Sequence, residues 1–125
     1  MFASASNDNS IRIWDQASFE CIYILNGHTN YVNSLVVVQN KYLISISDDQ
    51  SFIVWDILNN FLILTATKNA NALCSIALFS IDSFVTGDEN GTIQMWSTSE
   101  FNFKNENTLN KLSDSVSGLV FLSNG

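Results

Sequence analysis

Short runs in which apolar and polar residues alternate follow one another along the chain, separated by clusters of Asn, Asp, Gly and Ser. Alternation with period 2 is typical of β-strands covered on one face, and no window shows the helical period. The pattern predicts an all-β chain of twelve strands: Phe2–Ser6, Ser10–Asp15, Cys21–Leu25, Val32–Val38, Tyr42–Ser47, Phe52–Asp56, Phe61–Ala66, Leu73–Phe79, Ser83–Thr86, Thr92–Trp96, a weak strand near Phe101–Lys104, and Val116–Leu122.

The same pattern recurs every 41 residues. Tryptophans stand at 14, 55 and 96; a Ser or Thr lies ten residues before each, and an Asp or Asn lies six residues before each in a short polar turn. The recurring residues are Ser4, Asp8 and Trp14, then Ser45, Asp49 and Trp55, then Thr86, Asn90 and Trp96. Such a period indicates a repeat architecture. We expect a single domain over residues 1–125, with repeats at about 1–26, 27–67 and 68–108 and the start of a further unit at 112–125.

With Gly27-His28 and Trp55-Asp56 added, these positions resemble the WD-repeat β-propeller family. The resemblance implies about three four-stranded antiparallel blades, a partial propeller. It also implies a structural, hydrogen-bonded tetrad of His28, Ser45, Asp49 and Trp55. An imidazole can donate to a carboxylate through one nitrogen and accept from a hydroxyl through the other, while Trp donates its N–H.

The other two repeats are degenerate. The first has Ser4, Asp8 and Trp14, but the chain begins after the place of its His. The third has Asn69 at the His position, Lys68 at the Gly position and Asn90 at the turn position. We expect the third repeat to keep the shape of a blade without the tetrad's network.

Candidate protein-binding residues come from the resemblance too. In the family, frequent contacts lie three and five residues after the His and one before the turn Asp. Here these positions are Tyr31, Asn33 and Asp48, with Glu89 and Asn7 at the turn position of the other repeats and Ala72 and Cys74 in the third. Tyr31 would serve as an anchor, and Asp48 with Glu89 would favour a basic peptide. The alternative is that Tyr31 only packs a loop.

Composition narrows the class of protein. The 125 residues carry a formal charge of −7 with only five Lys and Arg, which argues against nucleic acid or an anionic membrane as partner. One histidine and two cysteines cannot supply a structural zinc site, so we expect no metal and no cofactor. No segment reads as a signal peptide or a membrane span, which predicts an intracellular protein, cytoplasmic or nuclear, with Cys21 and Cys74 reduced and packed as small hydrophobic residues.

No set of residues indicates catalysis. His28 lacks convergent partners for acid–base chemistry, and Asp48-Asp49 occupies a turn. The densest acidic group is Asp82, Asp88 and Glu89, for which a weak cation site is the alternative to solvated loop charge. We therefore predict a non-catalytic protein–protein interaction scaffold within a multiprotein complex. A truncated propeller fragment without independent function is the alternative, and a propeller enzyme is less favoured.

Three repeats fall short of the ~4 to 8 blades that close a propeller ring. Either the sequence is a piece of a longer propeller, or copies assemble head to tail. Two copies would give six blades, with Val116–Leu122 of each completing the first blade of the other.

Overall fold

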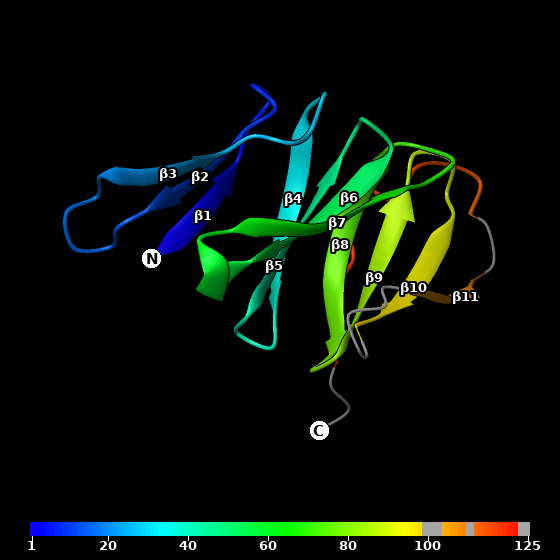
Figure 1. The fold of residues 1–125 in the computed structure, drawn as a ribbon. Helices are drawn as coiled ribbons and strands as arrows, with labels where there is room; N and C mark the ends of the chain where they lie inside the picture. Colours follow the sequence, from blue (N-terminus) through cyan, green and yellow to red (C-terminus); the bar gives the residue numbers. More distant parts are fainter. Residues whose placement is uncertain (99–103, 110–111, 123–125) are drawn as a thin grey trace.

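The computed structural model describes residues 1–98, 104–109 and 112–122, which form three antiparallel sheets in a row (Figure 1). The first blade has three strands, β1 (Phe2–Ala5), β2 (Ile11–Trp14) and β3 (Cys21–Leu25). The second has four, β4 (Val32–Val38), β5 (Tyr42–Ser47), β6 (Ser51–Asp56) and β7 (Leu62–Lys68), and so has the third, β8 (Leu73–Ser80), β9 (Ser83–Asp88), β10 (Ile93–Ser97) and β11 (Lys104–Thr108). Within each blade, every strand pairs with the strand that precedes or follows it in the sequence. The all-β prediction and the blade architecture are confirmed.

The 41-residue period fixes the register of each sheet. Each Trp pairs with the residue twelve positions before it: Phe2 with Trp14, Leu43 with Trp55, and Phe84 with Trp96. On its other side, the strand that carries the Trp shifts register immediately before the Trp in all three blades. The three sheets therefore repeat each other in pairing as well as in sequence.

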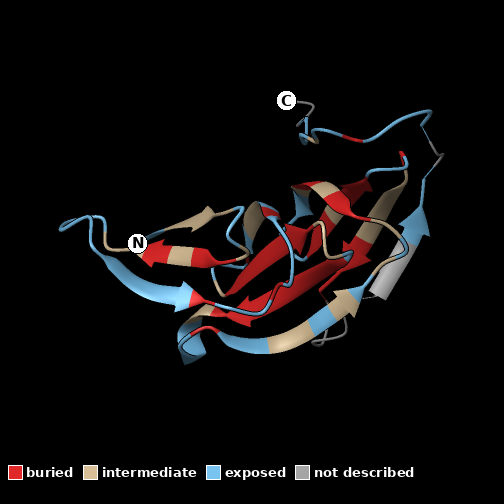
Figure 2. Ribbon diagram, turned by 90° about the horizontal axis from the view of Figure 1, so that it is seen from above, coloured by how far each residue is buried: buried red, intermediate tan, exposed pale blue. Residues whose placement is uncertain are grey.

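Apolar side chains fill the two spaces between the blades. Between the second and third blades, the Phe52 ring meets Phe84 with centroids 5.3 Å apart and Trp96 with centroids 4.8 Å apart. A second cluster, which includes Ile13, Leu43 and Trp55, joins the first blade to the second. Burial is complete along β5 and β6, whereas most of β3 is exposed (Figure 2). Each blade therefore depends on its neighbour to cover its face.

Two elements differ from the predicted strands. β11 begins at Lys104, whereas the sequence predicts a strand near Phe101–Lys104; residues 101–103 lie outside the described residues. A 3₁₀ turn at Ile57–Asn59 was not predicted. It is capped by Asp56, whose side chain accepts from the Leu58 amide, and it ends at Asn60 with a φ of 52°.

The predicted strand Val116–Leu122 is wrong for the isolated chain, because these residues enter no sheet. A strand needs a partner for its backbone groups, and none lies beside them. The segment contacts the third blade in other ways. Val116 N donates to Asp88 O at 3.0 Å, Ser75 Oγ donates to Val116 O at 2.7 Å, and the Phe121 ring meets that of Phe79.

Over the part of the chain that the structure describes, no helix has the length and apolar character needed to cross a membrane.

Candidate functional site

One chain of hydrogen bonds joins four side chains of the second blade. Asp49 comes from the turn between β5 and β6, Ser45 from β5, Trp55 from β6, and His28 from the loop before β4. His28 Nδ1 lies 2.8 Å from Asp49 Oδ2, and His28 Nε2 lies 2.7 Å from Ser45 Oγ. Trp55 Nε1 donates to the same Ser45 oxygen at 2.9 Å. The four residues that the sequence pattern groups therefore lie together, and the loop before β4 is tied to the two central strands.

Burial sets the charge state of this group. The side chains of His28 and Asp49 are only 1% and 5% exposed. Burial lowers the pKa of His28 below its usual value, and the hydrogen bond and charge of Asp49 oppose this effect only in part. Burial raises the pKa of Asp49, but donation from Ser51, Thr29 and His28 outweighs it, so that the pKa of Asp49 falls below its usual value. At neutral pH a neutral imidazole donates from Nδ1 to a carboxylate and accepts the Ser45 hydroxyl proton at Nε2.

The third blade has a polar network of its own, which the sequence analysis missed. Asp88 Oδ1 accepts from the backbone N–H groups of Asn90 and Thr92 at 2.9 and 2.8 Å. Asn71 Nδ2 donates to Asp88 Oδ2 at 3.0 Å, and Asn90 Nδ2 donates to Asn71 Oδ1 at 2.7 Å. This network differs from the tetrad's network, which the sequence predicts to be absent from this repeat, because its carboxylate stands two residues earlier than in the second blade. Asn69, at the His position, instead donates to Thr67 O at 3.4 Å.

A bond between Trp and a hydroxyl is common to all three blades. Trp14 Nε1 donates to Ser4 Oγ and Trp96 Nε1 donates to Thr86 Oγ1, each at 2.9 Å, as Trp55 does to Ser45. In the first blade, Asp8 Oδ1 accepts from Ser10 N at 2.9 Å, and hydrogen bonds from the Ser10 hydroxyl and amide lower the pKa of Asp8 to about 2. These polar residues thus hold the turn and the central strand pair in each blade.

The predicted binding residues lie at one end of the sheets, which we call the turn end: the end that carries the turns at 7–9, 48–50 and 89–91 (Figure 1). Tyr31 is 47% exposed, and its carbonyl accepts from Asp48 N at 3.0 Å. Asn33 Nδ2 donates to Asp48 Oδ1 at 2.6 Å and to Leu73 O of the next blade at 2.8 Å. The structure thus brings Tyr31, Asn33 and Asp48 together where two blades meet.

The remaining predicted residues lie at the same end. Glu89 binds Ala72 twice, by its N–H to the Ala72 carbonyl at 3.0 Å and by Oε1 to the Ala72 amide at 3.3 Å. Asn7 is exposed in the turn of the first blade. Burial, followed by the charges of Asp48, Glu89 and Asp88, raises the pKa of Cys74. Three carboxylates from two blades therefore make the potential around Cys74 negative.

The structure bears on one alternative and corrects one expectation about side chains. Asp82 lies in the turn between β8 and β9, whereas Asp88 closes β9 and Glu89 follows it, so a whole strand separates Asp82 from the other two. Among the described residues, no group of three or more His, Cys, Asp and Glu is placed to hold a metal ion. Cys21 is exposed on β3 and is not packed as a small hydrophobic residue.

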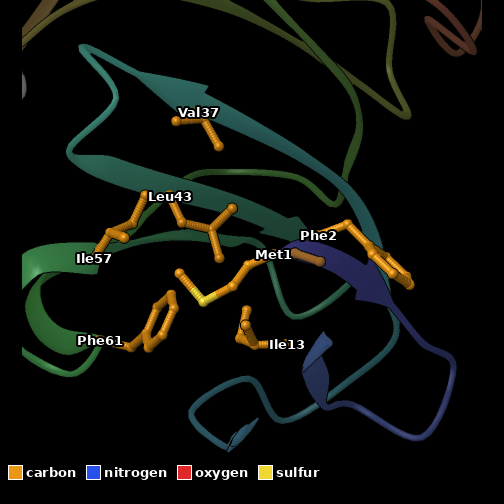
Figure 3. A pocket seen from close by; sticks show the side chains of 8 residues that line it. Met1, Phe2, Ile13, Val37, Leu43, Ile57 and Phe61 are labelled. Carbon is orange, nitrogen blue, oxygen red and sulfur yellow. The ribbon is translucent and has the colours of Figure 1, made fainter. Parts of the chain in front are cut away.

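A pocket between the first and second blades was not predicted. Eight apolar side chains line it; in Figure 3 the side chains of Met1 and Phe61 lie near each other, with Ile13 below them, and Val37 and Leu43 contribute from β4 and β5. A lining of this kind offers contact area without a group that could move a proton. The predicted binding residues lie elsewhere, at the turn end.

Comparison with known proteins gives a family and several relatives. The family model described as "WD domain, G-beta repeat" matches residues 1–15 and 19–56. The F-box/WD repeat-containing protein sel-10 of Caenorhabditis elegans is 30% identical over 96 residues, 74% of this chain and 16% of that protein. Cell division control protein 4 of Saccharomyces cerevisiae is 31% identical over 121 residues, 81% of this chain and 16% of that protein. Nuclear distribution protein nudF of Aspergillus flavus is 43% identical over 56 residues, 44% of this chain and 12% of that protein. The chain thus spans a small part of the length of each.

Proposed function

The chain belongs to the WD-repeat family, and from this premise we propose that it is a non-catalytic scaffold that binds peptides or protein domains within a multiprotein complex. The observation that carries the proposal is the exposed Tyr31, whose carbonyl accepts from Asp48 N, with Asn33 bonded to Asp48 and with Glu89 of the next blade also at the turn end. Loops held by a rigid β-scaffold are where recognition residues usually lie.

Tyr31 is the anchor of the proposed site. Its backbone is fixed by the bond from Asp48 N, while its side chain is exposed. An aromatic side chain has few rotatable bonds, so it gives a partner a large contact area at a small loss of conformational entropy. A residue whose role was only to pack its own loop would bury more of its ring.

Charge favours a basic partner. The negative charges of Asp48, Asp88 and Glu89 all help to raise the pKa of Cys74, and the whole chain carries seven more acidic than basic side chains. A Lys or Arg side chain placed here would meet a complementary potential, which speeds association and selects against acidic partners.

The tetrad supports this site indirectly. Asp49 follows Asp48 directly, and it is held by His28, by the Thr29 amide at 3.0 Å and by the Ser51 amide at 2.9 Å. We infer that the role of His28, Ser45, Asp49 and Trp55 is structural: they fix the turn that presents Asp48. The degenerate positions in the other blades would do the same for Asn7 and Glu89.

Three blades also need further blades beside them. We propose that either the rest of a longer chain or a second copy supplies them, the second copy by closing a six-bladed ring. An intracellular location, in the cytoplasm or the nucleus, stays a prediction from the sequence.

The test uses a synthetic Lys/Arg-rich peptide as a probe, with an acidic peptide of equal length for comparison. We expect the protein to bind the basic peptide and not the acidic one. The double variant Tyr31→Ala/Asp48→Asn should weaken binding about tenfold or more, since an anchor and a charge partner are lost together. Titration followed by fluorescence of a labelled peptide measures both affinities.

Glu20→Gln is the matched control. Glu20 is exposed in the loop between β2 and β3, away from the turn end, so its removal changes the net charge equally without touching the proposed site. Equal weakening by both variants would mean that net charge alone attracts the peptide. Unchanged binding by the double variant, with the near-UV signal of the three tryptophans intact, would overturn the assignment.

A further inference from the structure

Residues 116–122 carry the side-chain pattern of a blade's first strand. β4 reads Val-Asn-Ser-Leu-Val-Val-Val from Val32, and β8 begins Leu-Cys-Ser-Ile-Ala-Leu-Phe at Leu73. From Val116 the chain reads Val-Ser-Gly-Leu-Val-Phe-Leu. Apolar residues occupy positions one and four to seven in all three segments, and a small residue occupies position three. Sequence therefore predicts for this segment the pairing that β4 and β8 show.

The segment also starts where a first strand starts. Val116 N donates to Asp88 O at 3.0 Å, as Val32 N donates to Ser6 O at 3.1 Å, and Ser6 and Asp88 occupy equivalent positions two repeats apart. Val116 sits over Gly87: a Cβ on that glycine would lie 2.5 Å from Val116 Cβ. The third blade is thus shaped to seat Val116.

From Gly118 onward the segment lacks the partner that this role requires. Val120, Phe121 and Leu122 are 79%, 53% and 77% exposed, and none of them is in a sheet. The equivalent residues of β4 and β8, which pair with the next strand of their own blade, are less exposed: Val37, Leu78 and Phe79 are 43%, 40% and 41% exposed, Val36 and Ala77 are partly buried, and Val38 is buried.

β1 offers the complementary edge. In the described residues it pairs with β2 alone, so its other side has no strand, and the first blade lacks the inner strand that β4 and β8 supply to their blades. Phe2 on this edge is 47% exposed. Pairing would bury apolar side chains from both segments and satisfy two rows of backbone groups.

The two segments of one chain cannot meet, because the second blade stands between them: β4 contacts β1 on one side and β8 on the other (Figure 1). Building on the second-copy arrangement in the proposed function, we propose that residues 116–122 of one copy pair antiparallel with β1 of a second copy, and reciprocally. The exchange gives the first blade of each copy its fourth strand and closes the ring around a twofold axis.

The repeat also fixes the register. In the second blade Leu35 pairs with Ser45 and Val36 with Ile44; in the third, Ile76 pairs with Thr86 and Ala77 with Val85. In β4 and in β8, the second residue of the strand is left out of the pairing, directly after the first pair. By equivalence, Leu119 of one copy faces Ser4 of the other, Val120 faces Ala3, and Phe121 faces Phe2.

A cysteine pair tests the register in the 125-residue chain, with Cys21 and Cys74 replaced by serine. Directly opposite residues in an antiparallel pair lie about 4.5–5.5 Å apart between Cα atoms, within the span of a disulfide. We expect Ala3→Cys/Val120→Cys to form a covalent dimer on mild oxidation, visible on a non-reducing gel. Ala5→Cys/Val120→Cys is the matched control: it is offset by two residues, about 7–8 Å diagonally, and should cross-link far less.

Mass in solution, measured by sedimentation on the unmodified chain, completes the test. A dimer together with selective cross-linking of the Ala3/Val120 pair supports the proposal. A monomer with intact tryptophan signal overturns it, and so does a dimer in which both cysteine pairs cross-link equally. Binding of the basic peptide, measured on the same samples, is independent of these outcomes; its loss with an intact exchange would overturn only the peptide-binding proposal.

Discussion

The second and third blades hold equivalent turns by different chemistry. In the second, the turn carboxylate of Asp49 is almost fully buried and is bound by His28, which reaches on to Ser45 and Trp55. In the third, the carboxylate has moved two residues earlier to Asp88, and the amides of Asn71 and Asn90 replace the imidazole. Both blades keep a Trp–hydroxyl bond of 2.9 Å and the same strand register.

The comparison separates what a blade needs from what can vary. The turn needs an acceptor for its N–H groups, and Asp49 meets that need for Ser51 just as Asp88 does for Asn90 and Thr92. The central strands need a partner for the buried indole N–H, which Ser45 and Thr86 supply. The histidine adds a link from the turn to the strand pair. The third blade does without that link, and its network lies nearer to water, since Asn90 is exposed.

Removing the histidine should break the second network far more severely than removing Asn71 breaks the third. His28→Ala leaves a cavity, deprives the Ser45 hydroxyl of its acceptor and removes one donor to buried Asp49, so we expect a loss of about 3–4 kcal/mol in the free energy of unfolding. Asn71→Ala removes hydrogen bonds that water can replace, at about 1 kcal/mol. Urea unfolding followed by tryptophan fluorescence measures both. Equal losses of unfolding free energy in the two variants would mean that the buried His28 network stabilises the protein no more than the exposed network of the third blade.

The sequence was sufficient to predict features that repeat at a fixed spacing. The Trp–hydroxyl bonds lie where a ten-residue interval places them, because the two residues are diagonal neighbours across a hairpin with a short turn: each Ser or Thr pairs with the residue two positions before the Trp. The central strands of the three blades follow from the alternation of apolar and polar residues, because each of them buries apolar side chains against a neighbouring blade.

The sequence did not predict features that depend on a partner strand or on a residue that replaces another at a nearby position. The repeat places the third turn's carboxylate at position 90, which is Asn, and only the folded hairpin shows that Asp88 accepts from Thr92 N as Asp49 does from Ser51 N. An Asp two residues before the expected position, with Asn71 at its loop, was the available signal. Val116–Leu122 has the composition of a strand, but alternation cannot show whether a partner strand lies beside it.

The pH dependence of the free energy of unfolding should also distinguish the two networks, with a smaller effect than that of His28→Ala. The pKa of His28 is lower in the folded protein than its usual value of 6.5, so the unfolded chain binds the proton more readily. The free energy of unfolding should therefore be highest above about pH 6.5 and fall as the pH drops from there toward the folded pKa of His28. His28 is the chain's one histidine, so His28→Ala should flatten this window, whereas Asn71→Ala should leave its slope unchanged. A slope that survives in His28→Ala would assign the effect to other groups.

Asn90→Asp should have the smallest effect, and its sign is the informative part. The substitution gives the third repeat the turn residue that the first two have, so the period alone predicts a gain in stability. The structure predicts a loss of about 0.5–1 kcal/mol. The new carboxylate would face the Asn71 Oδ1 atom that now accepts from Asn90, and it would stand beside the charges of Asp88 and Glu89 with no histidine to receive it. Because the site is exposed, added salt should reduce the charge part of this loss. Urea unfolding at low and high ionic strength measures the loss, and Asp49→Asn is the converse exchange in the second blade. A stabilised Asn90→Asp variant would show that the third turn tolerates the Asp found in the first two turns. It would also show that the amide network of Asn71 and Asn90 is not matched to Asp88.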